Sequence, residues 1–418
     1  MNNKKFIVIF IVLLLLIFES ISFIYFRFIS NDLNNLTFYS EKRKGNLSYR
    51  YFENVGLVLP NIENKKDLIV THYTKEFTDK FIFRDILGLG FGFPDDGLDD
   101  RKFKAVAIGD SFTRGVGSID NLKNGWVELI EKKNKDIDII NLGHLGAGIN
   151  DQKYGYDKLK KFINHNVIIY SSISTEDYRD NLSDTHYSYY VEKVYKKSGN
   201  KEAQKLINDL QIRHGYKYHL EYLLKNKFKS YSIYFVFKIA DYLINKKILP
   251  TYKFKYVIPE DETRLKIVDD ELFELSKNKE YYKIVCNEKY CYQDINEKII
   301  TEAILDKIIL NFANKINQFH EESLKDSKEF IFVLLSNAGH FYPNQTPYDH
   351  SKLDEKLIEL LDPRIKVVNI GKKLSEINNR KKGRTYFYKY DGHYNIEGYK
   401  AVSDIMSKEL KIILDSKK

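Results

Sequence analysis

The sequence contains little of several residue types and motifs that mark specialised proteins. Among 418 residues there are 7 prolines and 21 glycines, which is too few for a long disordered linker. Neither the phosphate-loop pattern G-x-x-x-x-G-K nor the metalloprotease pattern H-E-x-x-H occurs. The net charge is +9, but the charges are scattered and form no nucleic-acid-binding module. We therefore expect no metal, no cofactor and no nucleic-acid partner.

Cysteine is also scarce, with 2 in the chain, at Cys286 and Cys291. In an exported domain, two cysteines this close in sequence could close a small disulfide across a hairpin. Two free thiols are the alternative. A metal site would need further ligands, and no histidine lies within the stretch.

Only one long hydrophobic run is present, and it lies at the N-terminus. The residues from Phe6 to Phe18 are all apolar and follow Lys4 and Lys5, and apolar character resumes after Ser20 as far as Phe26. No small-residue cleavage site follows, and the run is about the ~20 residues that cross a bilayer. We predict that residues 1–29 are an uncleaved signal anchor, with a cleaved signal peptide or a buried helix as alternatives. The protein would then be a single-pass membrane protein whose bulk is extracytoplasmic, in the periplasm or at the cell surface.

From residue 101 onward, strand-like and helix-like patterns alternate. The predicted strands are β-branched or apolar runs bounded by turn residues: Lys104–Ile108, Ile137–Leu142, Val167–Ser171, Phe330–Leu335 and Ile365–Ile370. The predicted helices are Leu122–Lys133, Asn150–Ile163, Thr301–Phe319 and Ile396–Leu414. This alternation predicts an α/β fold with a parallel sheet and helices on both faces.

Two regions interrupt this rhythm. Residues 30–100 are mixed, and we predict an N-terminal segment that wraps the sheet edge. Residues 182–300 are too long for a loop, and we predict an inserted helical and mixed subdomain, helical over Lys201–Lys247 and built of short strands over Val257–Tyr292. The main domain would thus comprise residues 101–181 and 301–418. No internal repeat is visible.

A serine stands directly after the first predicted strand. Lys104–Ile108 ends at Gly109-Asp110-Ser111, and a helix-like segment follows, so that the hydroxyl projects beyond the carboxyl end of a strand. Ligands of open α/β sheets bind there. A serine or aspartate in such a turn is by itself an ordinary helix cap, which is the role we assign to Asp110. Ser111 is a nucleophile only if a base and oxyanion donors accompany it.

Two motifs resemble the SGNH (GDSL-type) hydrolase superfamily. Gly109-Asp110-Ser111-Phe112 resembles its first block, and Asp391-Gly392-His393-Tyr394-Asn395 resembles its last, in the order that the family uses. The resemblance implies a three-layer sandwich with a five-stranded, flavodoxin-like parallel sheet. It also implies that Ser111 is the nucleophile, His393 the base and Asp391 the group that orients the imidazole. The short Asp-x-His spacing is similar to the membrane-anchored branch that includes alginate acetylation proteins.

The resemblance also assigns the oxyanion donors. The segment from Asn141 to Gly148 matches the family's second block, in which a glycine, here Gly146, gives its backbone N–H to the oxyanion. The N–H of Ser111 would be another donor. The alternative is that the same glycines only form an ordinary strand-to-helix turn and have no role in the oxyanion hole.

The third block departs from the family pattern. The family has an asparagine donor after the third strand, and this chain has Glu176 at that position, following Ser174 and Thr175. An ionised carboxylate accepts hydrogen bonds and cannot donate them. Either Glu176 is held protonated, or Ser174, Thr175 or a nearby asparagine replaces it, or the oxyanion hole is weakened. Loss of one donor costs roughly 10²–10³-fold in rate.

These residues predict acyl transfer. The expected function is that of a serine-dependent esterase acting on O-acyl groups, chiefly O-acetyl groups, of an extracytoplasmic glycan or lipid. A polysaccharide O-acetyltransferase with the same triad is the alternative, and a catalytically inactive glycan-binding scaffold is a second one. The sequence does not indicate an oligomeric state.

Overall fold

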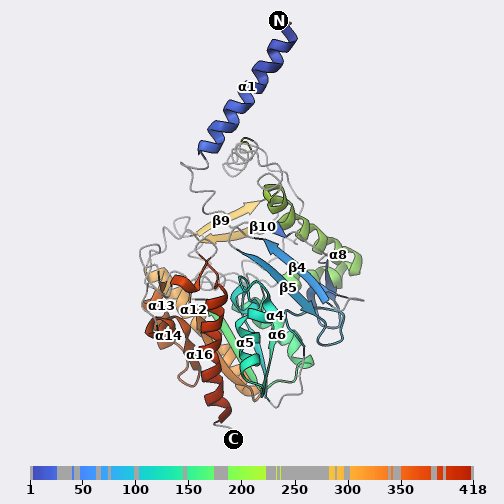
Figure 1. The fold of residues 1–418 in the computed structure, drawn as a ribbon. Helices are drawn as coiled ribbons and strands as arrows, with labels where there is room; N and C mark the ends of the chain where they lie inside the picture. Colours follow the sequence, from blue (N-terminus) through green and yellow to red (C-terminus); the bar gives the residue numbers. More distant parts are fainter. Residues whose placement is uncertain are drawn as a thin grey trace.

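A computed structural model gives the fold of the chain (Figure 1). It describes residues 3–25, 40–41, 48–62, 67–73, 77–97, 103–144, 148–173, 187–222, 232, 236, 282–287, 290–295, 302–337, 340–341, 350–377, 384–388 and 392–415.

A five-stranded parallel sheet forms the centre of the molecule. Its strands are β6 (Phe103–Ile108), β7 (Ile137–Asn141), β8 (Val167–Ile173), β11 (Glu329–Leu335) and β12 (Lys366–Asn369), in the spatial order β12-β11-β8-β6-β7. All four strand pairings are parallel. Counted along the chain, this is the order 2-1-3-4-5 of the flavodoxin-like doubly wound sheet. The predicted α/β fold and its five strands are therefore confirmed.

Helices cover both faces of the sheet, as the alternating pattern predicts (Figure 1). On β6, Val106 and Ile108 point into one core and Ala105 and Ala107 into the other, because successive side chains of a strand face opposite ways. The first core is covered by α6 (Ile149–Leu159), α12 (Glu302–Lys325) and α13 (His350–Glu359). The second is covered by α5 (Trp126–Lys133), α14 (Ile370–Ile377) and α16 (Ile396–Asp415).

The helix predicted at Leu122–Lys133 is divided in the structure. A short helix, α4 (Asn121–Asn124), is followed by α5, and Gly125 between them has an extended backbone, with φ −60° and ψ 146°. The helix α6 likewise passes into a 3₁₀ turn, η2 (Lys160–Phe162). Helices α13 and α14 were not predicted; they have 10 and 8 residues.

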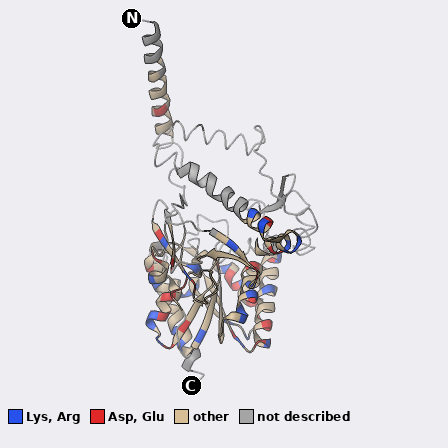
Figure 2. Ribbon diagram, turned by 90° about the vertical axis from the view of Figure 1, so that its right-hand side faces the viewer, with Lys and Arg blue, Asp and Glu red and all other residues tan. Residues whose placement is uncertain are grey.

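Positively and negatively charged residues are interspersed along the ribbon of the α/β body (Figure 2). The Lys153 ammonium, for example, lies 2.7 Å from the Asp157 carboxylate on its own helix and 2.6 Å from the Glu322 carboxylate on α12. These contacts join two helices on the same face of the sheet. Burial by itself would lower the pKa of Lys153, but the two carboxylates outweigh burial and the pKa is raised.

The segment before the parallel sheet forms two small antiparallel sheets. One contains β1 (Ser40–Glu41), β4 (Asp67–Tyr73) and β5 (Thr78–Arg84), and the other is the hairpin of β2 (Ser48–Phe52) and β3 (Leu57–Asn61). The β5 side chains Phe81 and Phe83 pack with Val116, which follows the Ser111 turn. Phe52 and Leu57 of the hairpin pack into the first sheet core. This region therefore packs against the α/β body beside the Ser111 turn.

The predicted insertion is described only in part. Helix α8 (Tyr187–Tyr222) starts earlier than predicted, and β9 (Tyr282–Asn287) pairs with β10 (Tyr290–Ile295) as an antiparallel hairpin. Cys286 stands opposite Cys291 in this hairpin, a register in which α-carbons are about 4.5–5.5 Å apart. A disulfide requires about that spacing. The disulfide itself stays a prediction, as do the domain boundaries.

The N-terminal apolar run forms α1 (Asn3–Ile24), which projects from the folded body (Figure 1). Among the described residues, no helix reaches the combination of length and apolar character required to cross a bilayer. The membrane anchor therefore stays a prediction.

Candidate active site

Ser111 lies at the carboxyl end of β6, where the strand order reverses. β6 has β7 on one side and β8 on the other, so its end is the switch point at which doubly wound sheets bind ligands. Ser111 begins a one-turn helix, α3 (Ser111–Arg114), and its own N–H has no acceptor within that helix. Asp110 caps the helix, because its Oδ1 accepts the Phe112 N–H at 2.9 Å. The structural role predicted for Asp110 is confirmed.

The turn that carries Ser111 packs tightly on β8. Thr113 Oγ1 and Ser171 Oγ form a short hydrogen bond, and Ser171 Oγ also donates to the Ile108 carbonyl at 3.0 Å. All three residues are buried. A Cβ on Gly109 would overlap both hydroxyls and would lie 2.9 Å from the Ser171 carbonyl oxygen. Only glycine therefore allows β6 to turn at this distance from β8.

His393 lies beside Ser111, although 282 residues separate them. The Nε2 atom of His393 is 2.8 Å from Ser111 Oγ, which is hydrogen-bonding distance. The imidazole stacks on the Phe112 ring, with centroids 4.6 Å apart and planes at 29°. Ser111 and His393 are both half-buried, so a substrate can approach them. Asp110 Oδ2 also lies 3.4 Å from Ser111 Oγ.

Three tyrosines fix the segment that carries His393. Tyr394 is buried, and its hydroxyl lies 2.9 Å from the Ser336 N–H and 2.7 Å from the Ser336 hydroxyl at the end of β11. Tyr388 donates to the Gly117 carbonyl at 3.0 Å, and Tyr399 donates to the Val116 carbonyl at 2.6 Å. The imidazole is thus held against the nucleophile turn by hydrogen bonds on both sides of residue 393.

The 3₁₀ turn η5 (Arg384–Tyr386) precedes this segment and is joined to it through the backbone. The Asn395 N–H donates to the Tyr386 carbonyl, and the Tyr388 N–H donates to the His393 carbonyl, both at 2.9 Å. Gly392 has a φ of 84°, a conformation that favours glycine, so the chain can reverse just before His393.

Asn141, at the end of β7, joins the nucleophile turn to the second-block turn. Its amide nitrogen donates to the Thr113 carbonyl at 3.0 Å, and its Oδ1 accepts the Gly143 N–H at 2.9 Å. A Cβ on Gly143 would overlap the backbone of Arg114, which lies in α3. The His144 N–H also donates to the Gly109 carbonyl at 2.8 Å. The two turns that the resemblance names as sources of oxyanion donors are therefore packed backbone to backbone.

Buried carboxyl groups lie behind Asn141. Glu128 Oε1 accepts the second amide hydrogen of Asn141 at 3.1 Å, and Asp95 Oδ2 accepts its backbone N–H at 2.7 Å. Burial raises the pKa of Asp95 to about 7 and raises the pKa of Glu128 well above its usual value. Burial likewise raises the pKa of Glu131, nearby on α5, to about 9. Burial thus favours the neutral form of both glutamates, because their charged forms would be desolvated.

The N-terminal sheet supports the other side of the nucleophile helix. The Arg114 guanidinium lies 4.7 Å from the ring centroid of Phe83 and 5.2 Å from that of Phe81, both on β5. These are cation–π distances. The predicted wrap thus contacts the turn that presents Ser111.

The structure does not describe every residue that the sequence predicts for the site. Ser111 and His393 are brought together, whereas Asp391, Gly146 and Glu176 lie outside the described residues. The alternatives to Glu176, Ser174 and Thr175, lie outside them as well. Their predicted roles therefore stay predictions.

Sequence reasoning missed several supporting residues. Glu128 and the Thr113–Ser171 pair belong to no motif, and the second-block motif that contains Asn141 does not show that its side chain contacts Thr113 and Glu128. The only signal was the glycine spacing of the second block, which indicates a tight turn but not what it packs against.

One group of metal-ligating side chains occurs among the described residues, on α12 and after α13. His320, Glu321 and Asp362 could together offer three ligand atoms. However, the Arg364 guanidinium forms ion pairs with both carboxylates and lowers the pKa of Asp362 to about 2. Arginine thus already supplies the positive charge that a metal ion would bring.

Comparisons with known proteins give likenesses of fold. No family model matches the sequence, and no curated protein matches it. Solved structures that match include a lipase/acylhydrolase from Enterococcus faecalis, with 11% identity, 74% of this chain and 95% of that chain covered, and a TM-score of 0.33. A member of the lipolytic protein G-D-S-L family from Veillonella parvula has 11% identity, coverages of 73% and 97%, and a TM-score of 0.34.

A third match is an acetyl xylan esterase from the rumen bacterium Butyrivibrio proteoclasticus, with 9% identity, coverages of 85% and 72%, and a TM-score of 0.33. All three proteins carry the names of lipolytic enzymes or esterases.

Proposed function

We propose that this protein is a serine-dependent ester hydrolase of the SGNH type that forms an acyl-enzyme. The observation that carries the proposal is the 2.8 Å contact between Ser111 Oγ and His393 Nε2 at the carboxyl end of the central strand β6. A serine hydroxyl is a weak nucleophile until a base in hydrogen-bonding reach accepts its proton. The support around both residues keeps that contact in place.

In the proposed mechanism, Ser111 Oγ attacks the ester carbonyl carbon while His393 Nε2 accepts the hydroxyl proton. The tetrahedral intermediate collapses as His393 returns this proton to the departing alcohol, which leaves an acyl-serine. His393 then takes a proton from water, whose oxygen attacks the acyl carbon. The carboxylic acid departs and Ser111 recovers its proton.

The oxyanion would be held by the backbone N–H of Ser111 and, as the resemblance implies, by that of Gly146. Asp391 would orient His393. Support for the first donor is the position of Ser111 as the first residue of α3. Support for the second is the packing of the second-block turn on α3 through Gly143.

We further propose that the substrate is an O-acyl group, chiefly O-acetyl, on an extracytoplasmic glycan or lipid. The apolar run of α1 supports a membrane anchor, and its side chains, such as Leu15 and Ile17, are exposed. The Asp-x-His spacing supports the acetylation-like branch of the superfamily. Transfer of the acyl group to a sugar hydroxyl instead of water uses the same residues.

The test compares full-length protein in non-ionic detergent with its Ser111→Ala variant on p-nitrophenyl acetate. We expect the variant to lose at least about 10³-fold in kcat, because nucleophile and base act as a unit. Ser375→Ala removes an exposed helical hydroxyl on α14 and should leave kcat unchanged. A fluorophosphonate should label the wild type and the control but not Ser111→Ala.

Adding a sugar acceptor then separates hydrolysis from transfer, since a transferase forms acetylated sugar at the expense of acetate. If the wild type neither turns over the ester nor reacts with the fluorophosphonate, the enzymatic proposal is wrong and the glycan-binding scaffold is favoured.

A further inference from the structure

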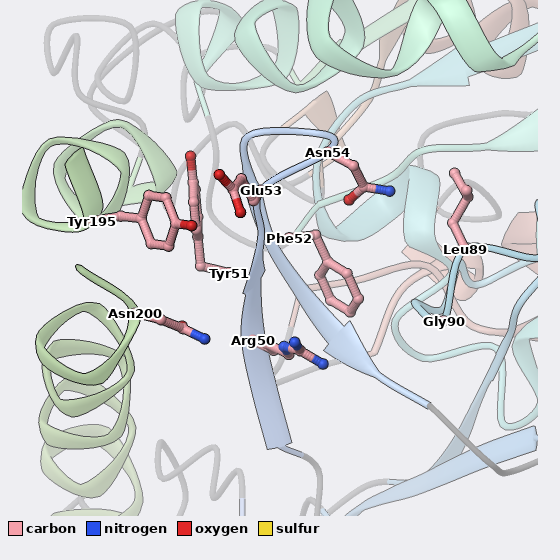
Figure 3. A pocket seen from close by; sticks show the side chains of 9 residues that line it. All are labelled: Arg50, Tyr51, Phe52, Glu53, Asn54, Leu89, Gly90, Tyr195 and Asn200. Carbon is pink, nitrogen blue, oxygen red and sulfur yellow. The ribbon is translucent and has the colours of Figure 1, made fainter.

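A pocket that does not include Ser111 lies along the edge of strand β2 that faces away from β3 (Figure 3). Its volume is about 480 Å³, and it is lined by Arg50, Tyr51, Phe52, Glu53, Asn54, Leu89, Gly90, Tyr195 and Asn200. In Figure 3, the Tyr51 and Tyr195 side chains lie on one side of β2, toward α8. Phe52 and Leu89 lie on the other side. We call this cavity the edge pocket.

The backbone groups of Tyr51 in β2 point toward the edge pocket and away from β3. Tyr51 stands opposite Val58 in the hairpin, yet the Val58 N–H donates to Ser188 Oγ at 2.8 Å. The pair is therefore of the non-hydrogen-bonded kind, and the backbone groups of Tyr51 face away from β3. In the described part of the chain, β2 pairs with β3 alone. One backbone N–H and one carbonyl thus face the pocket.

Helix α8 is bent so that it forms a wall of this pocket. Gly199 has φ 80° and ψ −179°, a conformation essentially restricted to glycine, and it divides the helix. Tyr195 comes from the part before the break and Asn200 from the part after it (Figure 3). The segments on either side are fixed to the hairpin: Val191 and Ala203 pack on Tyr51, and Gln204 donates to the Tyr49 carbonyl at 3.0 Å.

The wall combines aromatic rings with both donors and acceptors of hydrogen bonds. The Tyr51 and Tyr195 rings are 4.9 Å apart at 40°. The Tyr195 hydroxyl is hydrogen-bonded to the Glu53 carboxylate, which raises the pKa of that tyrosine. Arg50 lies on the opposite side, with its guanidinium 5.8 Å from the centroid of the Phe52 ring. The one cation and one anion leave the lining without net charge.

This composition discriminates among ligand classes. A phosphate or other anion would meet Glu53 as well as Arg50. An acyl chain would leave the charged and amide groups around it desolvated. An added peptide strand could pair only around Tyr51, because the Tyr49 carbonyl already accepts from Gln204. A sugar ring offers apolar C–H faces for the tyrosines and hydroxyls that both donate and accept.

We propose that the edge pocket binds one ring of a neutral saccharide. Arg50, Asn54 and Asn200 would donate to ring hydroxyls, Glu53 would accept from them, and Tyr195 would lie against the ring face. The choice of a saccharide over another neutral polyol rests on the proposed function. The pocket would then hold a glycan while Ser111 acts on another part of it.

The position of the pocket supports a role in holding a polymer. The hairpin turn lies at the far end of α6, where Lys161 donates to the Asn54 carbonyl at 3.4 Å, whereas α6 begins just after the second-block turn. With 11 residues, α6 is about 16 Å long. Only a saccharide of several residues could occupy the pocket and reach Ser111. Changes in the pocket should therefore not alter the rate at which small esters are hydrolysed.

The binding test uses the full-length Ser111→Ala protein, so that it does not depend on turnover. Xylohexaose and cellohexaose are titrated by calorimetry against this protein and against versions that also carry Tyr195→Ala or Asn200→Trp. Asn200 is exposed, so tryptophan fills the pocket without disturbing a core. Glu202→Ala, exposed on the same helix and outside the pocket, is the matched control.

We expect at least one hexasaccharide to bind, with affinity about tenfold weaker in both pocket variants and unchanged in the control, a difference of ~1.4 kcal/mol. In proteins with Ser111 intact, the pocket variants should hydrolyse p-nitrophenyl acetate at the wild-type rate. The proposal is overturned if neither saccharide binds, or if the pocket variants bind as well as the control.

It is equally overturned if an extended pentapeptide of alternating valine and threonine binds the pocket and the saccharides do not. Failure of ester hydrolysis in a protein that still binds saccharide through this pocket would refute the proposed enzyme and leave this site intact.

Discussion

The Ser111–His393 pair and the edge pocket are built in different ways. Ser111 and His393 stand on turns that are fixed by buried hydrogen bonds and by glycines that no larger residue can replace. The edge pocket lies between a two-stranded hairpin and a bent helix, and its polar residues Glu53, Asn54 and Asn200 are exposed. The first region therefore tolerates little change, whereas the second can change its lining without changing the fold.

This difference separates chemistry from recognition. Proton transfer between Ser111 and His393 requires the two atoms within about 3 Å, which a rigid sheet end can guarantee. Binding a saccharide requires only a suitable surface, which the N-terminal hairpin and α8 supply from outside the sheet. Changes at the sheet end should alter kcat, and changes at the edge pocket should alter affinity for a glycan alone.

Among the residues that position Ser111, Gly109 should have the largest effect when it is replaced. The Cβ of Gly109→Ala would overlap Thr113 and Ser171, so β6 and the Ser111 turn must separate from β8. We expect kcat on p-nitrophenyl acetate to fall about 10²-fold, since displacements on the order of 1 Å have that cost. The urea midpoint should fall as well, because the overlap lies in a packed core.

Gly155→Ala is the matched control, because its Cβ would meet no atom within 4 Å. Gly155 lies inside α6, so alanine should stabilise the protein by roughly 0.5–1 kcal/mol and leave kcat unchanged. Equal kcat in Gly109→Ala and Gly155→Ala would contradict the tight packing described for the nucleophile turn.

A smaller effect is expected from Asn141→Ala. The substitution removes the link between the Thr113 carbonyl and the Gly143 N–H, so the two turns can drift apart. We expect kcat to fall roughly 10–100-fold with little change in KM, because positioning acts on the transition state. Steady-state kinetics on p-nitrophenyl acetate measure both.

Glu128→Gln is the conservative partner of this experiment. Burial raises the pKa of Glu128 and so favours its neutral form, and glutamine keeps an oxygen that can accept from Asn141. Activity within about twofold of wild type is expected, since neither charge nor acceptor is lost. A loss as large as that of Asn141→Ala would mean that Glu128 acts as a carboxylate.

The smallest expected effect concerns stability and touches neither site. Glu131 is buried on α5 and accepts the Ile139 N–H at 2.7 Å, and burial raises its pKa from 4.5 to about 9. Between these pH values the unfolded chain has released a proton that the folded chain still holds. The stabilising contribution of Glu131 to the free energy of unfolding is therefore fully present below pH ~4.5. As the pH rises toward 9, this contribution declines by at most about 1.4 kcal/mol per pH unit.

Glu131→Gln keeps the acceptor and removes the titration. Urea unfolding between about pH 5 and 8 should show a weaker decline in stability for this variant than for wild type, with equal kcat on the acetate ester. Parallel stability curves for the two proteins would show that Glu131 is already ionised in the folded state.

Much of the main domain could be predicted from the sequence because its signals are local. The strand at Lys104–Ile108 is predicted by apolar and β-branched residues followed by a turn, and α16 is predicted by the spacing of its apolar residues. The helix break at Gly125 was not predicted, although a glycine inside a helical pattern is a local signal for such a break. Nor was the early start of α8, which depends on packing against β2 and β3.

The sequence alone determined the α/β class, the position of Ser111 after a central strand, and the pairing of an early G-D-S-F with a late histidine motif. Only the tertiary structure decided that His393 Nε2 lies 2.8 Å from Ser111, that Asn141 joins the two turns, and that β2 and α8 enclose a pocket. The physical reason is range: strands and turns are set by neighbouring residues, whereas these contacts join residues more than a hundred positions apart or depend on how whole elements pack.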